Sequence, residues 1–176
     1  MKFLLLSVCL AACLAGAAAP ARDGKAGEGK ARPDLSGTWV LDRPKSDFGV
    51  FWDRPLARTD ATLVVSHREP ELKMTRTLKL GGREETKEFT YYTDGRGETN
   101  ASTMAGAAVG TKTGWERDAV VARGKLSRPG KEGRVEVEVT ESWQLSGGGK
   151  TLTHRASMKG EFGEEEIKLV YRRAGS

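Results

Sequence analysis

The clearest structural signal in this chain is RVEVEVTESWQL at residues 134–145. Apolar and polar residues alternate through it, and the apolar set is Val135, Val137, Val139, Trp143 and Leu145. Successive side chains of a β-strand point to opposite faces of a sheet, so this alternation predicts a strand with one buried face and one wet face. Such a strand is typical of antiparallel sheets, and it argues against a sheet covered by helices on both sides.

Similar runs occur on both sides of this stretch, at the spacing expected of sandwiches and barrels. Gly81-Gly82, Asp94-Gly95 and residues 147–149 separate some of them and suit tight turns. Residues 47–58 carry one proline, Pro55, and read as a structured loop with one helical turn. We therefore expect an all-β fold, a lipocalin-like up-and-down antiparallel β-barrel of about nine strands. The predicted strands are 37–42, 61–67, 72–80, 85–93, 109–116, 119–126, 134–145, 150–158 and 165–173.

The N-terminus has the three parts of a secretory signal peptide. Lys2 supplies the positive charge, residues 3–14 are almost wholly apolar, and small residues follow through Ala19. We interpret residues 1–19 as a signal peptide, 20–33 as a flexible linker without large apolar residues, and 34–173 as the barrel domain. The expected location is extracytoplasmic, either periplasmic or secreted, and no second apolar run offers a membrane span.

Both cysteines of the chain, Cys9 and Cys13, lie in this leader. The mature domain therefore has no disulfide and no cysteine-based metal site. Leu10-Ala11-Ala12-Cys13 also resembles a bacterial lipobox, so the alternative is an outer-membrane lipoprotein anchored through Cys13.

Composition excludes several functional classes. The net charge of +5 becomes +4 when the leader takes Lys2 with it, and the remaining charges of both signs are interspersed. A nucleic-acid-binding face needs clustered basic residues with stacking aromatics, which this chain lacks, so we expect no nucleic-acid partner. No nucleophile elbow or complete phosphate loop is present either. We expect a non-catalytic protein without cofactor or metal.

The start of the domain resembles that of the lipocalins. Leu35-Ser36-Gly37-Thr38-Trp39 contains the Gly-x-Trp motif of that family. The chain is also similar to small secreted lipocalin-like proteins of soil bacteria, through Lys-Ser-Asp-Phe-Gly at 45–49 and a Trp-x-Leu-Ser hairpin at 143–153. The resemblance implies that Trp39 closes one end of the barrel and that Arg172 or Arg173 packs across it. Gly37 and Trp143 would then be structural residues as well.

Four polar residues share the phase of the buried set, namely His67, Arg76, Glu141 and His154. A buried charge needs a partner, so we expect a bidentate pair between Arg76 and Glu141. One interpretation makes this a purely structural ion pair. In the other, Arg76, His67 and His154 donate hydrogen bonds to a ligand with an acidic group in an otherwise apolar cavity.

We therefore expect a barrel that binds a small, partly apolar molecule, hydrophobic or amphipathic. The rival prediction is a structural or interaction protein of the cell envelope whose barrel interior is fully packed. The size of the interior cavity distinguishes the two.

Overall fold

A computed structural model describes residues 32–51, 54–130, 133–161 and 163–175, which belong to one compact unit. The predicted signal peptide, residues 1–19, and the linker up to residue 31 lie outside the described residues. The elements are β1 (Gly37–Leu41), η1 (Arg43–Lys45), η2 (Gly49–Phe51), α1 (Pro55–Arg58), β2 (Ala61–Arg68), β3 (Glu71–Leu80), β4 (Arg83–Tyr92), β5 (Glu98–Ala101), β6 (Ala108–Glu116), β7 (Ala119–Gly130), β8 (Gly133–Ser146), β9 (Thr151–Gly160) and β10 (Gly163–Arg173).

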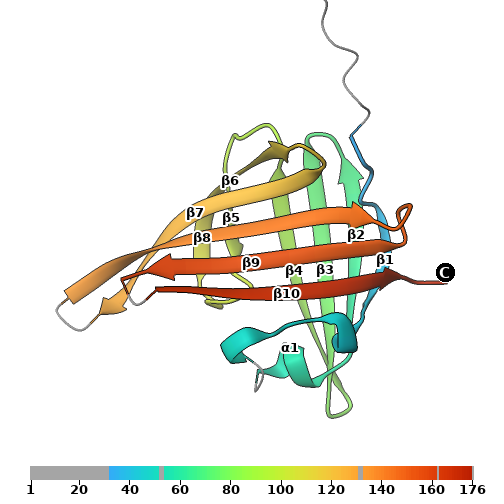
Figure 1. Cartoon of the computed structure of the whole chain (residues 1–176), viewed down its shortest axis with the longest axis horizontal. Helices are drawn as coiled ribbons and strands as arrows, with labels where there is room; N and C mark the ends of the chain where they lie inside the picture. The colour runs from blue at the N-terminus through green and yellow to red at the C-terminus, as the bar shows by residue number, and fades with distance from the viewer. Residues whose placement is uncertain (1–31, 52–53, 131–132, 162, 176) are drawn as a thin grey trace, which may run out of the picture. The chain divides into compact units, whose positions relative to one another are not determined.

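The described strands form one 10-stranded antiparallel sheet in the order β4-β3-β2-β1-β10-β9-β8-β7-β6-β5. Neighbours in the sheet are neighbours in the chain except where β1 pairs with β10, which rolls the sheet into a barrel (Figure 1). The expected all-β, up-and-down antiparallel barrel is confirmed, with ten strands instead of about nine. The additional strand is β5, and Asp94-Gly95 lies in a turn between strands that do not pair.

The barrel is nearly closed, because β4 and β5 stand at the two ends of the sheet. Asn100 of β5 bridges them by donating its Nδ2 to Thr90 O at 2.8 Å and accepting Thr90 N on its Oδ1 at 2.9 Å. Tyr92 N donates to Glu98 Oε2 at 3.2 Å. These side chains replace a backbone ladder over one part of β4. The residues from Arg83 to Glu88 have no strand on that side and are all exposed.

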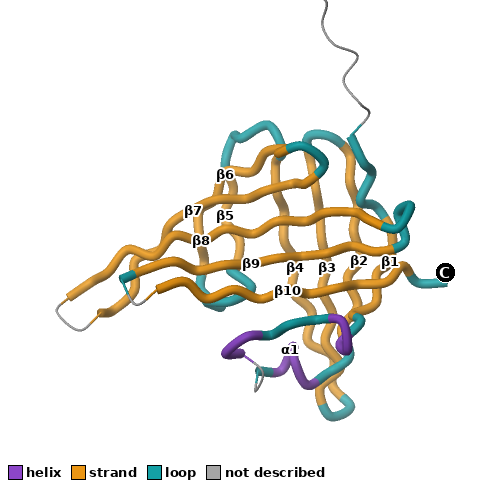
Figure 2. Tube along the Cα trace, viewed as in Figure 1, coloured by secondary structure: helices purple, strands orange, loops and turns teal. Residues whose placement is uncertain are grey.

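A helical segment made of η1, η2 and α1 lies at one end of the barrel, beside β10 (Figure 2). Asp47 of this segment exchanges backbone hydrogen bonds with Lys168 of β10, at 2.7 and 2.8 Å. The expected structured loop with a helical turn is thus confirmed, and it partly covers that end.

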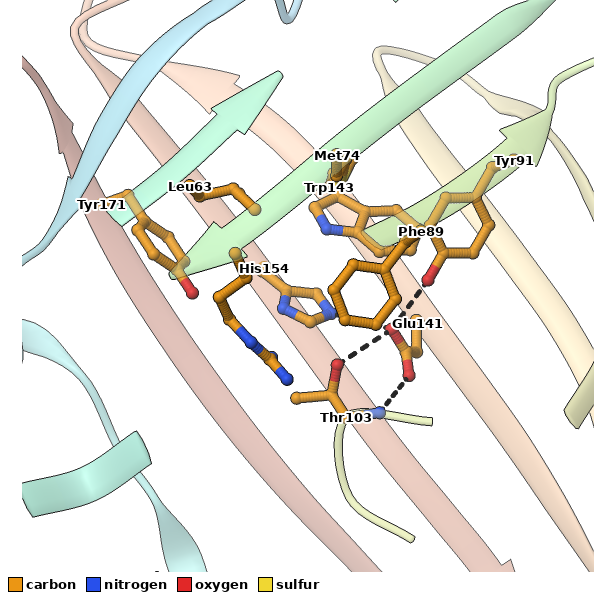
Figure 3. Close-up of a pocket in the computed structure, with 10 residues that line it drawn as sticks. Leu63, Met74, Phe89, Tyr91, Thr103, Glu141, Trp143, His154 and Tyr171 are labelled. Atoms are coloured by element: carbon orange, nitrogen blue, oxygen red, sulfur yellow. Dashed lines mark hydrogen bonds and ion pairs between the residues drawn. The ribbon is translucent and has the colours of Figure 1, made fainter. Parts of the chain in front are cut away.

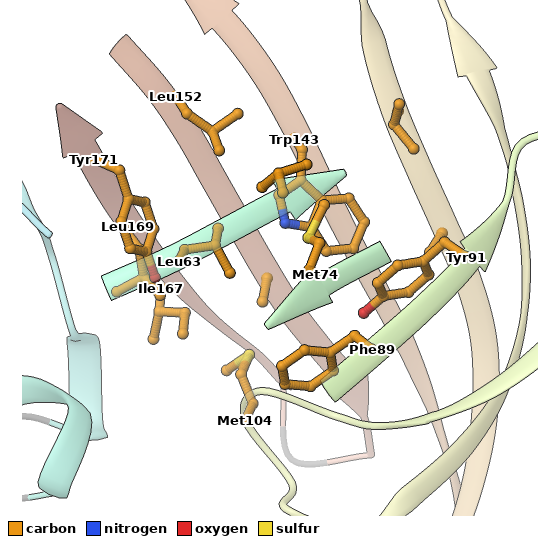
Figure 4. Close-up of a cluster of buried hydrophobic side chains, with 14 of the residues drawn as sticks. Leu63, Met74, Phe89, Tyr91, Met104, Trp143, Leu152, Ile167, Leu169 and Tyr171 are labelled. Atoms are coloured by element: carbon orange, nitrogen blue, oxygen red, sulfur yellow. The ribbon is translucent and has the colours of Figure 1, made fainter. Parts of the chain in front are cut away.

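The core lies inside the barrel and follows the predicted alternation (Figure 4). Buried residues alternate with more exposed ones along β8, and the aromatic residues Trp39, Trp143 and Tyr171 are all buried. Burial alternates in the same way along β3, and along β10 except at Val170, which is also buried. The inward set is therefore the one that the period of two predicts.

Trp39 is buried, and Arg173 packs across it. Its side chain is fully buried, and the Arg173 guanidinium lies 4.3 Å from its ring centroid. Arg173 also donates to Ser36 O and Gly149 O, each at 3.0 Å, whereas Arg172 is exposed. Gly37 has a φ of +142°, and a Cβ there would overlap the Arg173 guanidinium. Gly37 is thus needed for this close approach.

Candidate functional site

The centre of the candidate site is Glu141, which β8 points into the barrel. Its neighbours in register are Ala122 on β7 and Ala156 on β9. These small side chains leave room for a carboxylate that is only 4% exposed. A buried carboxylate is costly unless hydrogen bonds satisfy it.

Four hydrogen bonds satisfy this carboxylate, and those from Tyr91 and Thr103 are visible in Figure 3. Thr103, in the loop between β5 and β6, donates its backbone N to Oε1 at 2.9 Å and its hydroxyl to Oε2 at 3.3 Å. The Tyr91 hydroxyl donates to Oε2 at 3.4 Å, and His154 Nε2 lies 3.2 Å from the same oxygen. His154 in turn stacks on Trp143, with ring centroids 4.9 Å apart and planes 9° apart.

The electrostatics keep Glu141 ionised and its tyrosine partner neutral. Burial raises the pKa of Glu141, but the hydrogen bond and charge of His154, the Thr103 amide and the charge of Arg76 together hold that pKa below its usual value. Burial, and then the Glu141 charge, raise the pKa of Tyr91 well above its usual value. Burial raises the pKa of Tyr171 to about 12.

The expected pair between Arg76 and Glu141 is wrong. Instead, His154 makes the contact with the Glu141 carboxylate. His154 lies on β9, which is adjacent to β8, whereas Arg76 lies on β3. Arg76 is 8% exposed, and among the described residues it has no hydrogen bond or ion pair. Its Nε is buried without a partner, and its guanidinium lies 5.1 Å from the Phe89 ring centroid.

Arg76 faces a cavity of about 170 Å³, which we call the mouth pocket. The helical segment, β3, β4, the β5–β6 loop and β10 line it. Its walls are mainly apolar, and Arg76 and Thr103 also border the interior beyond it. The apolar lining residues are Phe48, Phe51, Pro55, Leu56, Leu78, Met104, Ala105 and Ile167, and the charged ones are Arg54, Arg76, Glu85 and Lys87.

The barrel interior beyond the mouth pocket is almost filled, because the cavity left there is about 10 Å³. That is room for about one water molecule. The side chains that fill this space include Met74, Phe89, Tyr91, Trp143 and Tyr171. The interior therefore has no room for an organic ligand, whereas the mouth pocket does.

His67 lies apart from the other three predicted residues and lines neither cavity. Its side chain is 5% exposed. Its Nδ1 accepts Leu35 N at 3.3 Å, and its Nε2 lies 3.2 Å from Glu69 Oε1. These contacts fasten the segment before β1 to the end of β2, which gives His67 a structural role. Arg76, Glu141 and His154 are brought together around one centre.

Two participants were not found from the sequence. Tyr91 shares the inward phase of Phe89, so its burial could have been inferred from alternation. Thr103 lies in a loop and carries no periodic signal. Ser102 shapes this loop by accepting Met104 N and Ala105 N on its hydroxyl, at 3.3 and 3.2 Å.

The part of the chain that the structure describes contains neither a cluster of metal-ligating side chains nor a long apolar helix. No group of three or more His, Cys, Asp or Glu residues converges there. No helix in the described ranges has the length and apolarity needed to cross a bilayer.

The nearly closed ten-stranded barrel has the same fold as lipocalin-like and fatty-acid-binding-protein-like β-barrels. The chain is similar to the solved structure of the REP1-NXSQ fatty acid transporter, with a TM-score of 0.56 and 13% identity over 81% of this chain and 98% of that chain. For the secretary abundant heat soluble protein of Ramazzottius varieornatus the TM-score is 0.54 and the identity 8%, over 79% of this chain and 94% of that chain. For zebrafish ileal bile acid-binding protein, solved with cholic acid, they are 0.50 and 11%, over 80% and 98%. At such identities the likeness shows the fold alone. No protein-family model matches the sequence, and no curated protein matches it.

Proposed function

We propose that this barrel binds a small amphipathic molecule with an anionic head, and that Arg76 receives the head in the mouth pocket. The observation that carries the proposal is the buried guanidinium of Arg76, which has no hydrogen-bonding partner among the described residues and borders a cavity with apolar walls. A buried donor without a partner is costly, so a ligand that satisfied it would gain affinity.

Glu141 does not supply the hydrogen-bonding partner that the Arg76 guanidinium lacks. Its two oxygens already accept four hydrogen bonds from other groups, so Arg76 is not required to satisfy it. The apolar walls then suit the body of the ligand. The names of two neighbours agree with this chemistry, because a fatty acid and cholic acid each join a carboxylate to an apolar body.

Calorimetric titration of the wild-type protein with octanoate and with octanol at neutral pH tests the proposal. The two ligands share a chain, so the difference isolates the head group. We expect octanoate to bind at least about tenfold more tightly, and Arg76→Met to abolish that preference. Lys79→Met is the matched control, since it removes an exposed cation from the same strand. Equal binding of the two ligands, or an unchanged preference in Arg76→Met, would overturn the proposal.

The rival function, a structural or interaction protein of the cell envelope, draws support from the nearly filled interior. Because of this observation, we propose the mouth pocket as the binding site, and not the barrel interior that we expected from the sequence. If neither amphiphile binds the wild-type protein, the rival becomes the better interpretation.

We further propose that the chain acts outside the cytoplasm, on the strength of the leader-like residues 1–19. N-terminal sequencing of the native protein should give a start between residues 18 and 22. An intact Met1 would refute export, and a mass matching diacylated Cys13 would assign the protein to the lipoproteins.

A further inference from the structure

The size of the mouth pocket limits what the barrel can hold. A cavity of about 150 Å³ accommodates a molecule the size of benzene, and pockets for drug-sized ligands span about 300–1,000 Å³. The mouth pocket, at about 170 Å³, lies near the lower figure. By this comparison it holds a single ring or a chain of about six to eight carbons.

The inner end of the pocket cannot yield to a longer chain. Beyond Arg76, the aromatic side chains of Phe89 and Trp143 fill the interior, and Trp143 is held by its stacking on His154. A hydrocarbon tail entering here would displace the hydrogen bonds that Thr103 and His154 make to Glu141. Leaving that carboxylate buried and unsatisfied would cost more free energy than burial of the hydrocarbon tail would contribute.

Among the described residues, charged side chains border the outer end of the pocket together with the exposed Pro55 and Ala105. Arg54 and Glu85 are exposed at the pocket lining, and Lys87 pairs there with Glu85 at 3.2 Å. A chain longer than the pocket would thus end beside hydrated charges, where further methylenes gain less burial than inside the pocket. The orientation follows from the same layout, with the anionic head at Arg76 and the apolar body between Phe51, Met104 and their neighbours.

We infer that the ligand is a short amphipathic anion, a carboxylate on about six to eight carbons or on one ring, and that longer acids gain little and steroid acids are excluded. This inference rests on the proposed function and names its substrate class. It separates this chain from the zebrafish neighbour, which was solved with cholic acid.

The test is a calorimetric titration of the wild-type protein with the sodium salts of butanoic, hexanoic, octanoic, decanoic, dodecanoic and hexadecanoic acids, each below its micelle concentration, and with benzoate and cholate. We expect affinity to rise about fourfold per methylene up to about octanoate and then to level off. Benzoate should bind and cholate should not.

A cavity-enlarging variant makes the test specific to this pocket. Met104 is buried at its wall, so Met104→Ala should move the plateau to an acid about two to three carbons longer. Met158→Ala is the matched control, because Met158 is equally buried on β9 and does not line the pocket. The plateau of the control should stay where the wild-type plateau is.

The outcomes distinguish the two proposals. Affinity that keeps rising to hexadecanoate, or binding of cholate, would overturn the size limit and leave the proposed function standing. A plateau that does not move in Met104→Ala, in a variant whose far-UV spectrum matches wild type, would also overturn it. Failure of every acid to bind wild type would overturn the proposed function itself.

Discussion

Replacing Arg76 with methionine should raise the stability of the ligand-free protein, although Arg76 is a buried charged residue. The buried Nε without a hydrogen bond costs about 1–3 kcal/mol, and methionine removes that cost. The cation–π contact with Phe89 is worth about 0.5–2 kcal/mol, and a sulfur–aromatic contact would return about 0.3–1.5 kcal/mol of it.

The loss of attraction to Glu141 opposes this gain. The four hydrogen bonds of that carboxylate remain in the variant and keep it satisfied. The balance is a gain of about 1 kcal/mol in the free energy of unfolding. That gain corresponds to a rise of about 3 °C in Tm.

Urea unfolding followed by far-UV circular dichroism at neutral pH measures this change. Lys79→Met, an exposed substitution of the same kind, should stay within about 0.5 kcal/mol of wild type. A loss of about 1 kcal/mol or more in Arg76→Met would refute the reasoning, because it would mean that neighbouring groups stabilise the guanidinium. A more stable variant that no longer binds octanoate would show a residue retained for its ligand at the expense of the fold.

Three further predictions concern other parts of the barrel. Gly37→Ala should lower the free energy of unfolding by about 1–3 kcal/mol, since its φ is +142° and the new Cβ overlaps Arg173; Gly110→Ala, with open space at its Cβ, is the control in the same thermal melts. Glu141 has a lowered pKa in the folded state, so its stabilisation is present above its usual pKa and is lost as the pH falls; wild type should thus lose stability more steeply than Glu141→Gln between about pH 5 and pH 3. Tyr171, with its pKa raised to about 12, stabilises the fold fully below its usual pKa and loses this effect as the pH rises, so Tyr171→Phe should resist alkaline unfolding better than wild type. Parallel pH curves for a variant and wild type would contradict either of the last two predictions.

The sequence predicted most of the fold because the inward face of each long strand is apolar at a period of two. The alternation in residues 134–145 places Val137, Val139, Glu141 and Trp143 inside, where the structure has them. The alternation did not predict β5, and the reason is physical. Glu-Thr-Asn-Ala at Glu98–Ala101 has no large apolar residue, and the strand is held by its pairing with β6 and by the side chains of Glu98 and Asn100.

The site was predicted only in part, because alternation tells which face a residue occupies and not where around the barrel it lies. Arg76, Glu141 and His154 are all inward, as expected. The choice of His154 as the partner of Glu141 depends on the register of β8 with β9, in which Trp143 opposes His154. A run of glycines such as 147–149 allows more than one register, so the sequence leaves this pairing open. Thr103 comes from a loop, for which no periodicity exists.

The unpaired part of β4 also bears on how the protein behaves at high concentration. A free strand edge is a template on which another chain can add a strand, and long apolar edges aggregate in this way. Five of the six residues from Arg83 to Glu88 are charged, and both signs are represented. A second copy adding a strand here would have to dehydrate these groups, and this cost opposes polymerisation. Glu85 and Lys87 also line the mouth pocket. The gap in the barrel can therefore persist beside the pocket without making the sheet a seed for fibres.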